Sequence, residues 1–170
     1  LTHPPRVLVL LAAFNGMEYL PAQMASILGQ QAVAVQVVLS IDRSSDGTEA
    51  WVAQLAQQDA RVSVLPGGQV FGGAAPNFFR LLSDVDMAGY DYVALADQDD
   101  LWHPDKLGRA YQQPQHTGAA GYSGNVIAFW PGGQERLIDQ SQPQQPWDFL
   151  FEGPGPGCTF VLTQPLALAL

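Results

Sequence analysis

Positive charge, cysteine and long apolar runs are all scarce in this sequence of 170 residues. Seven Lys and Arg stand against 16 Asp and Glu, a net charge of −9, which opposes binding to the phosphates of DNA or RNA. The single cysteine, Cys158, has no partner for an intramolecular disulfide. This fits a reducing compartment, and we expect a cytoplasmic protein. The longest apolar run, Val7 to Phe14, is too short for a membrane span, so we expect no transmembrane segment in this chain.

Apolar residues are plentiful. They make up 47% of the chain, while charged residues make up 14%, and this composition favours one packed domain over disorder. We therefore expect a single domain over residues 1–170. The chain ends in the apolar stretch Leu166 to Leu170 without a helix stop signal, so we expect the fold to be truncated at its C-terminus.

Apolar segments of two kinds alternate along the first two thirds of the chain. Continuous aliphatic runs predict strands at residues 6–13, 33–41, 61–65 and 90–96. Helical spacing of apolar residues predicts helices at residues 17–30, around 51–55, at 77–85 and at 104–113. This alternation predicts an α/β fold with a mostly parallel sheet, in which ligands bind outside the carboxyl ends of the strands.

The pattern changes after Pro114. Residues 121–130 and 158–162 are the strand-like pieces there. Between them, residues 131–157 predict a surface connection with a short helical turn around residues 147–151.

Three carboxylates are crowded into Asp97-Gln98-Asp99-Asp100, directly after an apolar strand. Like charges this close raise one another's pKa and cost stability unless a cation neutralises them. Carboxylate oxygens suit a hard divalent ion such as Mg²⁺ or Mn²⁺, which leaves its remaining positions to water and substrate phosphates. The alternative is a solvated loop in which one Asp caps the next helix. The spacing alone leaves both interpretations open.

Two further polar loops follow strands. Residues 42–48 follow the second strand and include Asp42 and Asp46, and residues 13–16 follow the first strand. In an open parallel sheet both loops reach the same edge as Asp97, so all three can line one crevice. Ser-Ser-Asp-Gly-Thr is also typical of a plain turn and helix cap, and residues 13–16 equally suit a plain turn.

Four motifs occur together in order: residues 12–16 (AAFNG), 40–48 (SIDRSSDGT), 71–73 (FGG) with Asn77-Phe78, and 97–107 (DQDDLWHPDKL). In series they resemble the family-two glycosyltransferases, and the match is closest to the rhamnosyltransferase-like branch that builds bacterial surface polysaccharides. Gly157-Cys158-Thr159 and the apolar residues after it resemble the acceptor-side strand of that branch. The resemblance covers residues 6–112 and 153–163.

The resemblance implies a Rossmann-like nucleotide-diphospho-sugar transferase fold of the A type, with residues 1–112 as a donor-binding half and 113–170 as an incomplete acceptor-side half. Asp42 would bind the base or ribose, Asp97 would approach the ribose, and Asp99 would ligate the metal. Asp100 would be a reserve metal ligand or an acceptor-side group. The full set of implied nucleotide-sugar ligands is Phe14, Asn15, Asp42, Asp46, Asn77 and Asp97, and the implied metal ligands are Asp99 and Asp100.

The sequence departs from the family pattern at the second strand. Ile41 stands where the family has the first of two adjacent aspartates, and Arg43 stands where it has glycine. Arg43 then either meets a phosphate or is simply solvated. The general base that inverting transfer needs is implied to come from a motif downstream of the Gly-Cys strand, beyond Leu170. Within the chain, Asp148 and Glu152 are the carboxylates late enough to replace it.

The resemblance therefore implies an inverting, metal-dependent glycosyltransferase with Mn²⁺ or Mg²⁺. It would move a sugar, for example rhamnose, from a UDP- or dTDP-type donor to a polysaccharide or lipid-linked glycan acceptor, in the cytoplasm or at the inner face of the membrane. A metal would also offset the repulsion between an acidic protein and an anionic donor. The alternative is a non-catalytic metal- or sugar-binding module with a structural cation at Asp97, Asp99 and Asp100.

Overall fold

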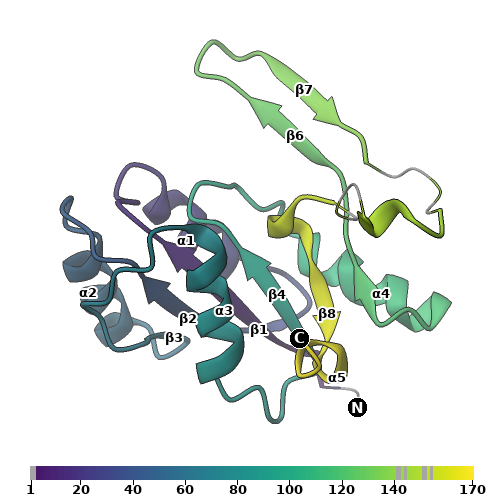
Figure 1. Cartoon of the computed structure of the whole chain (residues 1–170), viewed down its shortest axis with the longest axis horizontal. Helices are drawn as coiled ribbons and strands as arrows, with labels where there is room; N and C mark the ends of the chain where they lie inside the picture. The colour runs from purple at the N-terminus through teal and green to yellow at the C-terminus, as the bar shows by residue number, and fades with distance from the viewer. Residues whose placement is uncertain (1–2, 141–142, 144, 151–152, 154) are drawn as a thin grey trace.

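A six-stranded sheet forms the centre of the computed structural model, which describes residues 3–140, 143, 145–150, 153 and 155–170 (Figure 1). Its strands lie in the order β3 (Val62–Val64), β2 (Ala34–Ile41), β1 (Arg6–Ala13), β4 (Tyr92–Ala96), β8 (Val161–Thr163) and β5 (Gly121–Tyr122). The first four strands in this order are parallel, while β8 is antiparallel to both β4 and β5. The predicted α/β fold with a mostly parallel sheet is confirmed.

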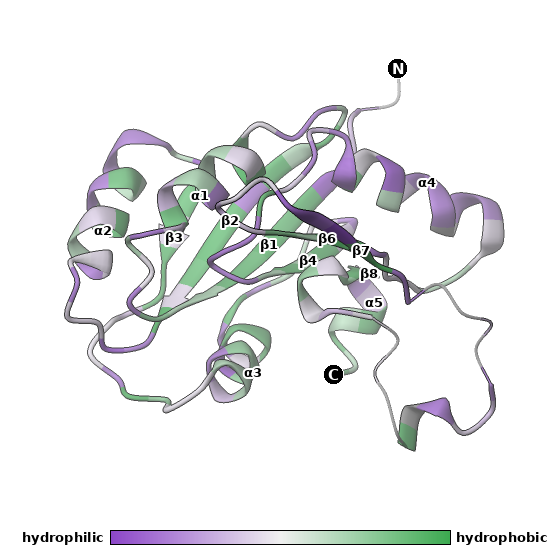
Figure 2. Cartoon of the chain, turned by 90° about the horizontal axis from the view of Figure 1, so that it is seen from above, coloured by the Kyte–Doolittle hydropathy of each residue, from purple (hydrophilic) through white to green (hydrophobic). Residues whose placement is uncertain are grey.

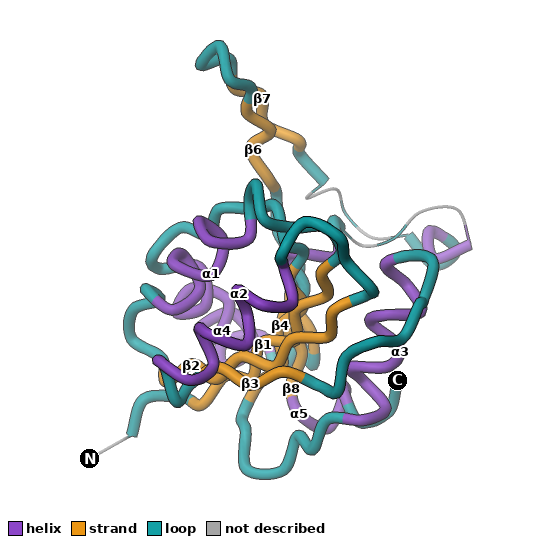
Figure 3. The backbone as a smooth tube through the Cα atoms, turned by 90° about the vertical axis from the view of Figure 1, so that its left-hand side faces the viewer, coloured by secondary structure: helices purple, strands orange, loops and turns teal. Residues whose placement is uncertain are grey.

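Helices cover both faces of the sheet. One face carries α1 (Leu20–Leu28), α2 (Thr48–Gln58) and α4 (Lys106–Thr117), and the other carries α3 (Ala74–Asp84) and the short α5 (Gln164–Ala167). Figures 2 and 3 show these layers, with apolar strands between them. None of the helices in the described part of the chain combines the length and the apolar character needed to cross a membrane.

The central strand β1 is apolar at consecutive positions because both of its faces are covered. Val7, Val9 and Leu11 belong to the core cluster shared with α1, α2 and α4. Leu8 and Leu10 belong to the cluster shared with α3. The same alternation explains why the sequence shows an unbroken aliphatic run here rather than a period of two.

The C-terminal part differs from its predictions in three places. Residues 121–130 are not one strand: β5 ends at Tyr122, and Val126–Phe129 form β6, which pairs with β7 (Glu135–Ile138) in a hairpin that projects from the domain (Figures 1 and 3). The strand predicted from Cys158 begins at Val161, because residues 157–159 form the 3₁₀ turn η2 (Gly157–Thr159). The strand β7 lies in the predicted surface connection and was missed, since a run of four residues carries little periodic signal.

Two local predictions concern helices near prolines. Helix α4 begins at Lys106 rather than Pro104, because residues 103–106 form a turn in which the Lys106 N–H donates to the His103 carbonyl at 3.0 Å. It also continues past Pro114 to Thr117, whose hydroxyl donates to the Gln113 carbonyl at 2.9 Å. The predicted turn near Trp147 is present as the 3₁₀ turn η1 (Asp148–Leu150).

Candidate functional site

The carboxyl ends of β1, β2 and β4 meet at one edge of the sheet. Ala13 is the register partner of Ile41, and Leu11 is the partner of Ala96. The loops after these strands surround a cavity of about 560 Å³. Its lining includes the predicted site residues Phe14, Asp42, Asn77, Asp97 and Asp99, together with Arg43, Gln98 and the loop residues Val70, Gly72 and Gly73. The sheet therefore brings five of the predicted residues to one cavity.

Asn15 and Asp46 lie outside the cavity lining and hold two loops together instead. The Asn15 side-chain oxygen accepts from the Ser45 N–H at 2.8 Å. Asp46 accepts from the Met17 N–H at 2.9 Å and from the Thr48 hydroxyl at 2.6 Å. These bonds, with that of Thr48 the largest, hold the pKa of the Asp46 carboxyl below its usual value. Both side chains thus fix the loop after β1 against the loop after β2.

Gln98 fixes the position of Phe14. Its side-chain oxygen accepts from the Phe14 N–H at 2.7 Å, and its side-chain NH₂ donates to the Phe14 carbonyl at 2.9 Å. Phe14 is 53% exposed, so its ring presents an apolar face at the cavity. Gly16 leaves room for this pair, because a Cβ there would lie 2.6 Å from the Gln98 oxygen. The acidic loop and the first loop are therefore joined through one amide side chain.

Asn77 and Arg43 occupy the side of the cavity near β2. The buried Asn77 NH₂ donates to the Ser40 carbonyl at 3.1 Å and to the Ala13 carbonyl at 3.4 Å. Arg43 donates to the Gly68 carbonyl at 3.0 Å. Arg43 is exposed, and its guanidinium is bonded to the backbone of the loop before α3. Its contact with a phosphate stays a prediction.

Helix α1 supports the acidic loop from below. The side chain of Gln23, which is fully buried, donates to the Asp97 carbonyl at 3.0 Å. The Ser26 hydroxyl accepts from the Trp102 N–H at 3.1 Å. Both ends of the loop that carries the three carboxylates are therefore tied to the same helix.

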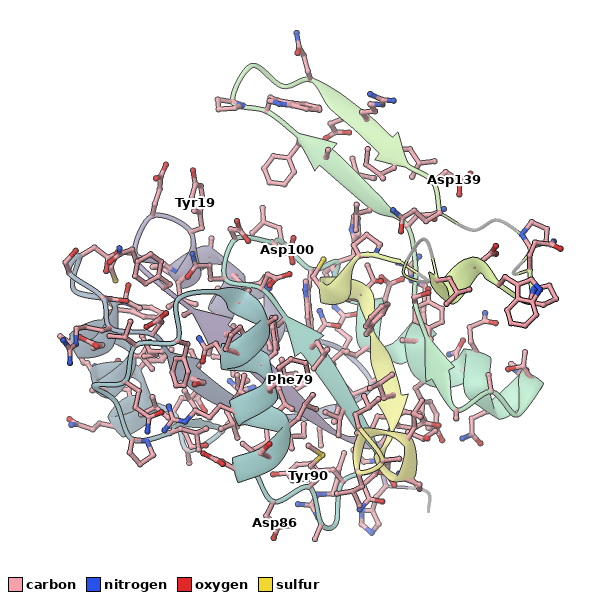
Figure 4. All side chains as sticks on the ribbon, viewed as in Figure 1. Tyr19, Phe79, Asp86, Tyr90, Asp100 and Asp139 are labelled. Atoms are coloured by element: carbon pink, nitrogen blue, oxygen red, sulfur yellow. The ribbon has the colours of Figure 1, made fainter. Side chains whose placement is uncertain are left out.

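Two of the three carboxylates of the acidic loop line the cavity. They are Asp97 and Asp99. Asp100 is not part of the lining; it follows β4 (Figure 4), and its carboxyl interacts with the Cys158 thiol. Burial is the main cause that raises the pKa of Asp97 and of Asp100, and the neighbouring carboxylates raise that of Asp97 further. The charge of Lys106 lowers the pKa of both carboxyls. A buried Asp100 oxygen, Oδ2, has no hydrogen-bond partner.

Lys106 joins the acidic loop to the turn before β8. Its ammonium donates to the Cys158 carbonyl at 2.6 Å and lies 3.2 Å from the centre of the Trp102 ring. Burial lowers the pKa of Lys106 to about 7, and raises the pKa of the Cys158 thiol to about 12. Cys158 therefore stays a thiol near neutral pH, and a thiol is a weak nucleophile.

Two groups of side chains have the chemistry to hold a divalent cation. Asp97, Asp100 and Cys158 offer ligand atoms within 4.8 Å of one another, but one of the three is a sulfur, which hard divalent ions do not prefer. Lys106 also lies close to both carboxylates and, when protonated, repels a cation there. Asp97 and Asp99 offer oxygen atoms at the cavity, and Asp99 is exposed to incoming ligand. Mg²⁺ and Mn²⁺ prefer oxygen ligands and keep open positions for phosphate, so the residues at the cavity fit these ions.

Of the two predicted substitutes for the catalytic base, Asp148 does not line the cavity. The Asp148 carboxylate accepts from the Gln145 N–H at 2.7 Å within its own turn. Glu152 lies outside the described residues. The catalytic base therefore remains unassigned within this chain.

Sequence reasoning gave no role to three residues that build the site, Gln98, Gly72 and Lys106, and it did not foresee the bond from Arg43 to the Gly68 backbone. Gln98 and Lys106 lie inside motifs that the sequence showed, but their neighbours carried the apparent chemistry. The position of Gln98 carried a signal. An amide side chain in a loop after a buried strand commonly bonds to the backbone of an adjacent loop. Arg43 and Gly72 depend on a contact between loops that are 25 or more residues apart, which no local pattern encodes.

A family model and several known proteins match this chain. The model described as "Glycosyl transferase family 2" matches residues 8–154. A dTDP-rhamnosyl transferase of Shigella flexneri, RfbG, is 39% identical over 153 residues, which are 89% of this chain and 53% of the relative. The succinoglycan biosynthesis protein ExoO of Rhizobium meliloti is 30% identical over 115 residues, 68% of this chain and 31% of the relative. The chain thus spans about half of RfbG and about a third of ExoO.

Solved structures match the fold. The mannosyltransferase PcManGT of Pyrobaculum calidifontis, in complex with GDP-Man and Mn²⁺, superposes with a TM-score of 0.67 at 17% identity, over 97% of this chain and 46% of that one. TarS of S. aureus, residues 1–349 in complex with UDP-GlcNAc, superposes with a TM-score of 0.65 at 16% identity, over 95% and 46%. The expected A-type nucleotide-sugar transferase fold is confirmed.

Proposed function

Because the chain belongs to glycosyl transferase family 2, we propose that it is the donor-binding part of an inverting glycosyltransferase. The sugar, for which rhamnose is the first candidate, passes from a nucleoside diphosphate to a polysaccharide or lipid-linked glycan. One observation carries the proposal: Asp97 and Asp99 line the same cavity as Phe14 and Asp42. An anionic donor and the cation that neutralises it then share one site.

The two ends of the cavity suit different parts of the donor. Phe14, Arg43 and Val70 form the end toward β2, where an apolar ring face and a guanidinium suit a base and ribose. Asp97 and Asp99 form the end at β4, where a cation and a diphosphate belong. The name of the Shigella relative supports dTDP-rhamnose as the donor, with UDP as the other base to test.

Asp99 is the proposed ligand of Mn²⁺ or Mg²⁺, and Asp97 faces the ribose. Asp100 lies outside the cavity lining, and its proposed role is on the acceptor side of the loop. When bound, the cation would stabilise the negative charge that develops on the departing diphosphate. The chain's own residues position the donor, and the loops after β1 and β2 keep water from one side of it.

Transfer with inversion joins the acceptor oxygen to the anomeric carbon while the bond from that carbon to the diphosphate oxygen breaks. The electron pair of the broken bond stays on the diphosphate, and a carboxylate takes the acceptor's proton. We propose that this carboxylate lies outside residues 1–170, with Asp148 and Glu152 as the alternatives within the chain. A lipid-linked acceptor would bring the protein to the inner face of the membrane, which vesicle flotation tests.

A second candidate is a non-catalytic module that holds a structural cation at the acidic loop. The grouping of Asp97 and Asp100 with Cys158 within 4.8 Å favours this candidate. Such a module would bind Ca²⁺ in the absence of any nucleotide. The same titration therefore separates the two candidates.

Calorimetry with dTDP and with UDP, each with Mn²⁺ and again with EDTA, tests the proposal. We expect binding that needs Mn²⁺ and that falls roughly tenfold or more in Asp99→Asn, because the substitution removes a charged metal ligand. Asp105→Asn is the matched control, since it removes the same charge from an exposed ion pair with Arg109. Binding of Ca²⁺ with no response to either nucleotide would reject the donor site in favour of the module.

A further inference from the structure

One wall of the cavity is formed by a glycine-rich loop with a flexible backbone. Residues 66–73 connect β3 to α3 and contain four glycines, Gly67, Gly68, Gly72 and Gly73. Glycine has the largest backbone freedom to lose on ordering. Val70, Gly72 and Gly73 nevertheless line the cavity. Interactions from outside the loop must therefore set the wall in place.

The carboxylate of Asp42 supplies such interactions. Its Oδ1 accepts from the Phe71 N–H at 3.0 Å and from the Arg43 N–H at 2.8 Å, and its Oδ2 accepts from the Gly72 N–H at 3.0 Å. Asp42 is 5% exposed. Gly72 has a φ of +73°, a turn that suits glycine and that aims its N–H at the carboxylate. Three backbone donors thus engage a side chain that is almost closed to solvent.

Two arginines hold the other parts of the loop. The Arg43 N–H donates to the Gln69 carbonyl at 3.0 Å, in addition to the guanidinium bond to Gly68. Arg80 donates to the Pro66 carbonyl at 2.7 Å, and its guanidinium lies 5.4 Å from the centre of the Phe71 ring. The arginines bind loop carbonyls while Asp42 binds loop N–H groups. The wall is thereby fixed through both kinds of backbone group.

We propose that Asp42 acts on the nucleotide indirectly, as a positioning residue whose carboxylate holds residues 71–72 in the shape that forms the cavity wall. Asp42 then contributes to nucleotide affinity through the shape of the wall and not through a bond to the base. This inference rests on the proposed function, because it takes the ligand to be a nucleoside diphosphate. It differs from the direct contact with the base or ribose that the sequence motif suggested for Asp42.

Asp42→Asn tests the proposal, since the amide keeps the size of the side chain but turns an NH₂ group toward loop N–H groups that need an acceptor. Two readouts are combined. Hydrogen exchange of the Phe71 and Gly72 amides without ligand reports the wall, and we expect exchange to become roughly tenfold faster or more. Calorimetry with UDP, dTDP and the diphosphate of 3-methyluridine, each with Mn²⁺, measures whether the affinity depends on a contact with the base N3–H.

A direct bond from Asp42 to the base N3–H and an indirect role predict different affinities. In the indirect role, Asp42→Asn weakens all three nucleotides by the same factor, on the order of tenfold. In a direct role, the substitution weakens UDP and dTDP but leaves the methylated nucleotide, which has no N3–H, nearly unchanged. The second result would overturn the proposal, as would unchanged exchange at Phe71 and Gly72. Asp105→Asn again controls for the loss of charge.

A second variant guards against a general folding defect. Gly72→Ala leaves Asp42 intact and meets no atom within 4 Å, but it strains the turn at its positive φ. We expect the same uniform loss for all three nucleotides, and unchanged affinities would contradict the proposal. If the unsubstituted chain binds none of the nucleotides, the proposed function fails and the nucleotide role of Asp42 fails with it. Exchange at Phe71 and Gly72 still reports in that case whether Asp42 holds the loop.

Discussion

The loops around the cavity and the hairpin β6–β7 differ in what surrounds their side chains. At the cavity, polar side chains such as Asp42, Asp46 and Gln98 bond to the backbone of a neighbouring loop. On the hairpin, Phe129 and Leu137 are 56% and 58% exposed. The difference teaches that these polar motif residues hold the loops in shape through backbone bonds, in addition to any contact that they make with a ligand. We therefore expect the sheet and the loops at its edge to contribute more to the free energy of unfolding than the hairpin does.

The largest effect is expected where β1 is buried from both sides. Leu10→Ala removes a fully buried side chain from the cluster against α3, and we expect a loss of about 2–5 kcal/mol in the free energy of unfolding. Urea denaturation measures it. Leu137→Ala, the same substitution on the exposed hairpin, is the control. A similar loss in both variants would contradict the view that the sheet carries the stability.

Stability should also depend on pH through Lys106. An unfolded lysine keeps its proton up to a pKa of 10.5, whereas folded Lys106 loses it at a pKa of about 7. Between these values the unfolded state binds more protons, so stability rises with pH. Above pH 9.0 the unfolded thiol loses its proton while folded Cys158 keeps it up to a pKa of about 12, which opposes the rise.

Urea midpoints from pH 7 to 10 in EDTA measure this dependence. We expect an increase on the order of 2 kcal/mol between pH 7 and 9, followed by a plateau. Lys106→Met should remove the increase whatever its effect on the absolute stability. A midpoint that falls from pH 7 to 9 in the unsubstituted chain would show that Lys106 is not buried in its neutral form.

The link between Phe14 and Gln98 is expected to have a smaller effect. Gly16→Ala places a Cβ 2.6 Å from the Gln98 side-chain oxygen, so the amide must move and lose its bonds to Phe14. We expect a loss of about 1–3 kcal/mol in stability and weaker nucleotide binding. Gly132→Ala, where nothing lies within 4 Å of the added Cβ, is the control. Unchanged binding in Gly16→Ala would show that the position of Phe14 does not matter to the ligand.

The smallest effect is expected on the hairpin itself. Phe129→Thr replaces an exposed aromatic residue with another strand-forming residue. We expect a change within about 0.5 kcal/mol in stability and no change in nucleotide affinity. A cooperative loss of the whole fold in this variant would mean that the hairpin belongs to the same folding unit as the sheet.

Most of the sheet followed from the sequence because its strands carry strong local signals. The run at residues 6–13 was predicted to its ends, and the helix at 17–30 was placed within a few residues. Strand β6 lay within the predicted run at residues 121–130, but β7 and its pairing with β6 were missed because apolar and polar residues do not alternate along the hairpin. Val126 and Ile138 are half-buried while Ile127 and Leu137 are exposed, so both faces carry apolar residues.

The sequence predicted where the candidate site lies better than it predicted what each of its residues contacts. Parallel topology alone brings Phe14, Asp42 and Asp97 to one edge. Whether an aspartate faces the cavity or a backbone N–H depends on loops far apart in sequence. Asn15 and Asp46 look like ligands in a motif, yet their oxygens are used by Ser45, Met17 and Thr48. Only the assembled loops show that difference.

The position of the cation tests the central claim most directly. Crystals of the chain grown with dTDP and Mn²⁺ would locate the metal by its anomalous scattering. The account predicts a peak at the cavity, in direct contact with Asp99 and with the diphosphate of the nucleotide. A peak between Asp97, Asp100 and Cys158, with the nucleotide absent from the cavity, would contradict it and assign the acidic loop to a structural ion.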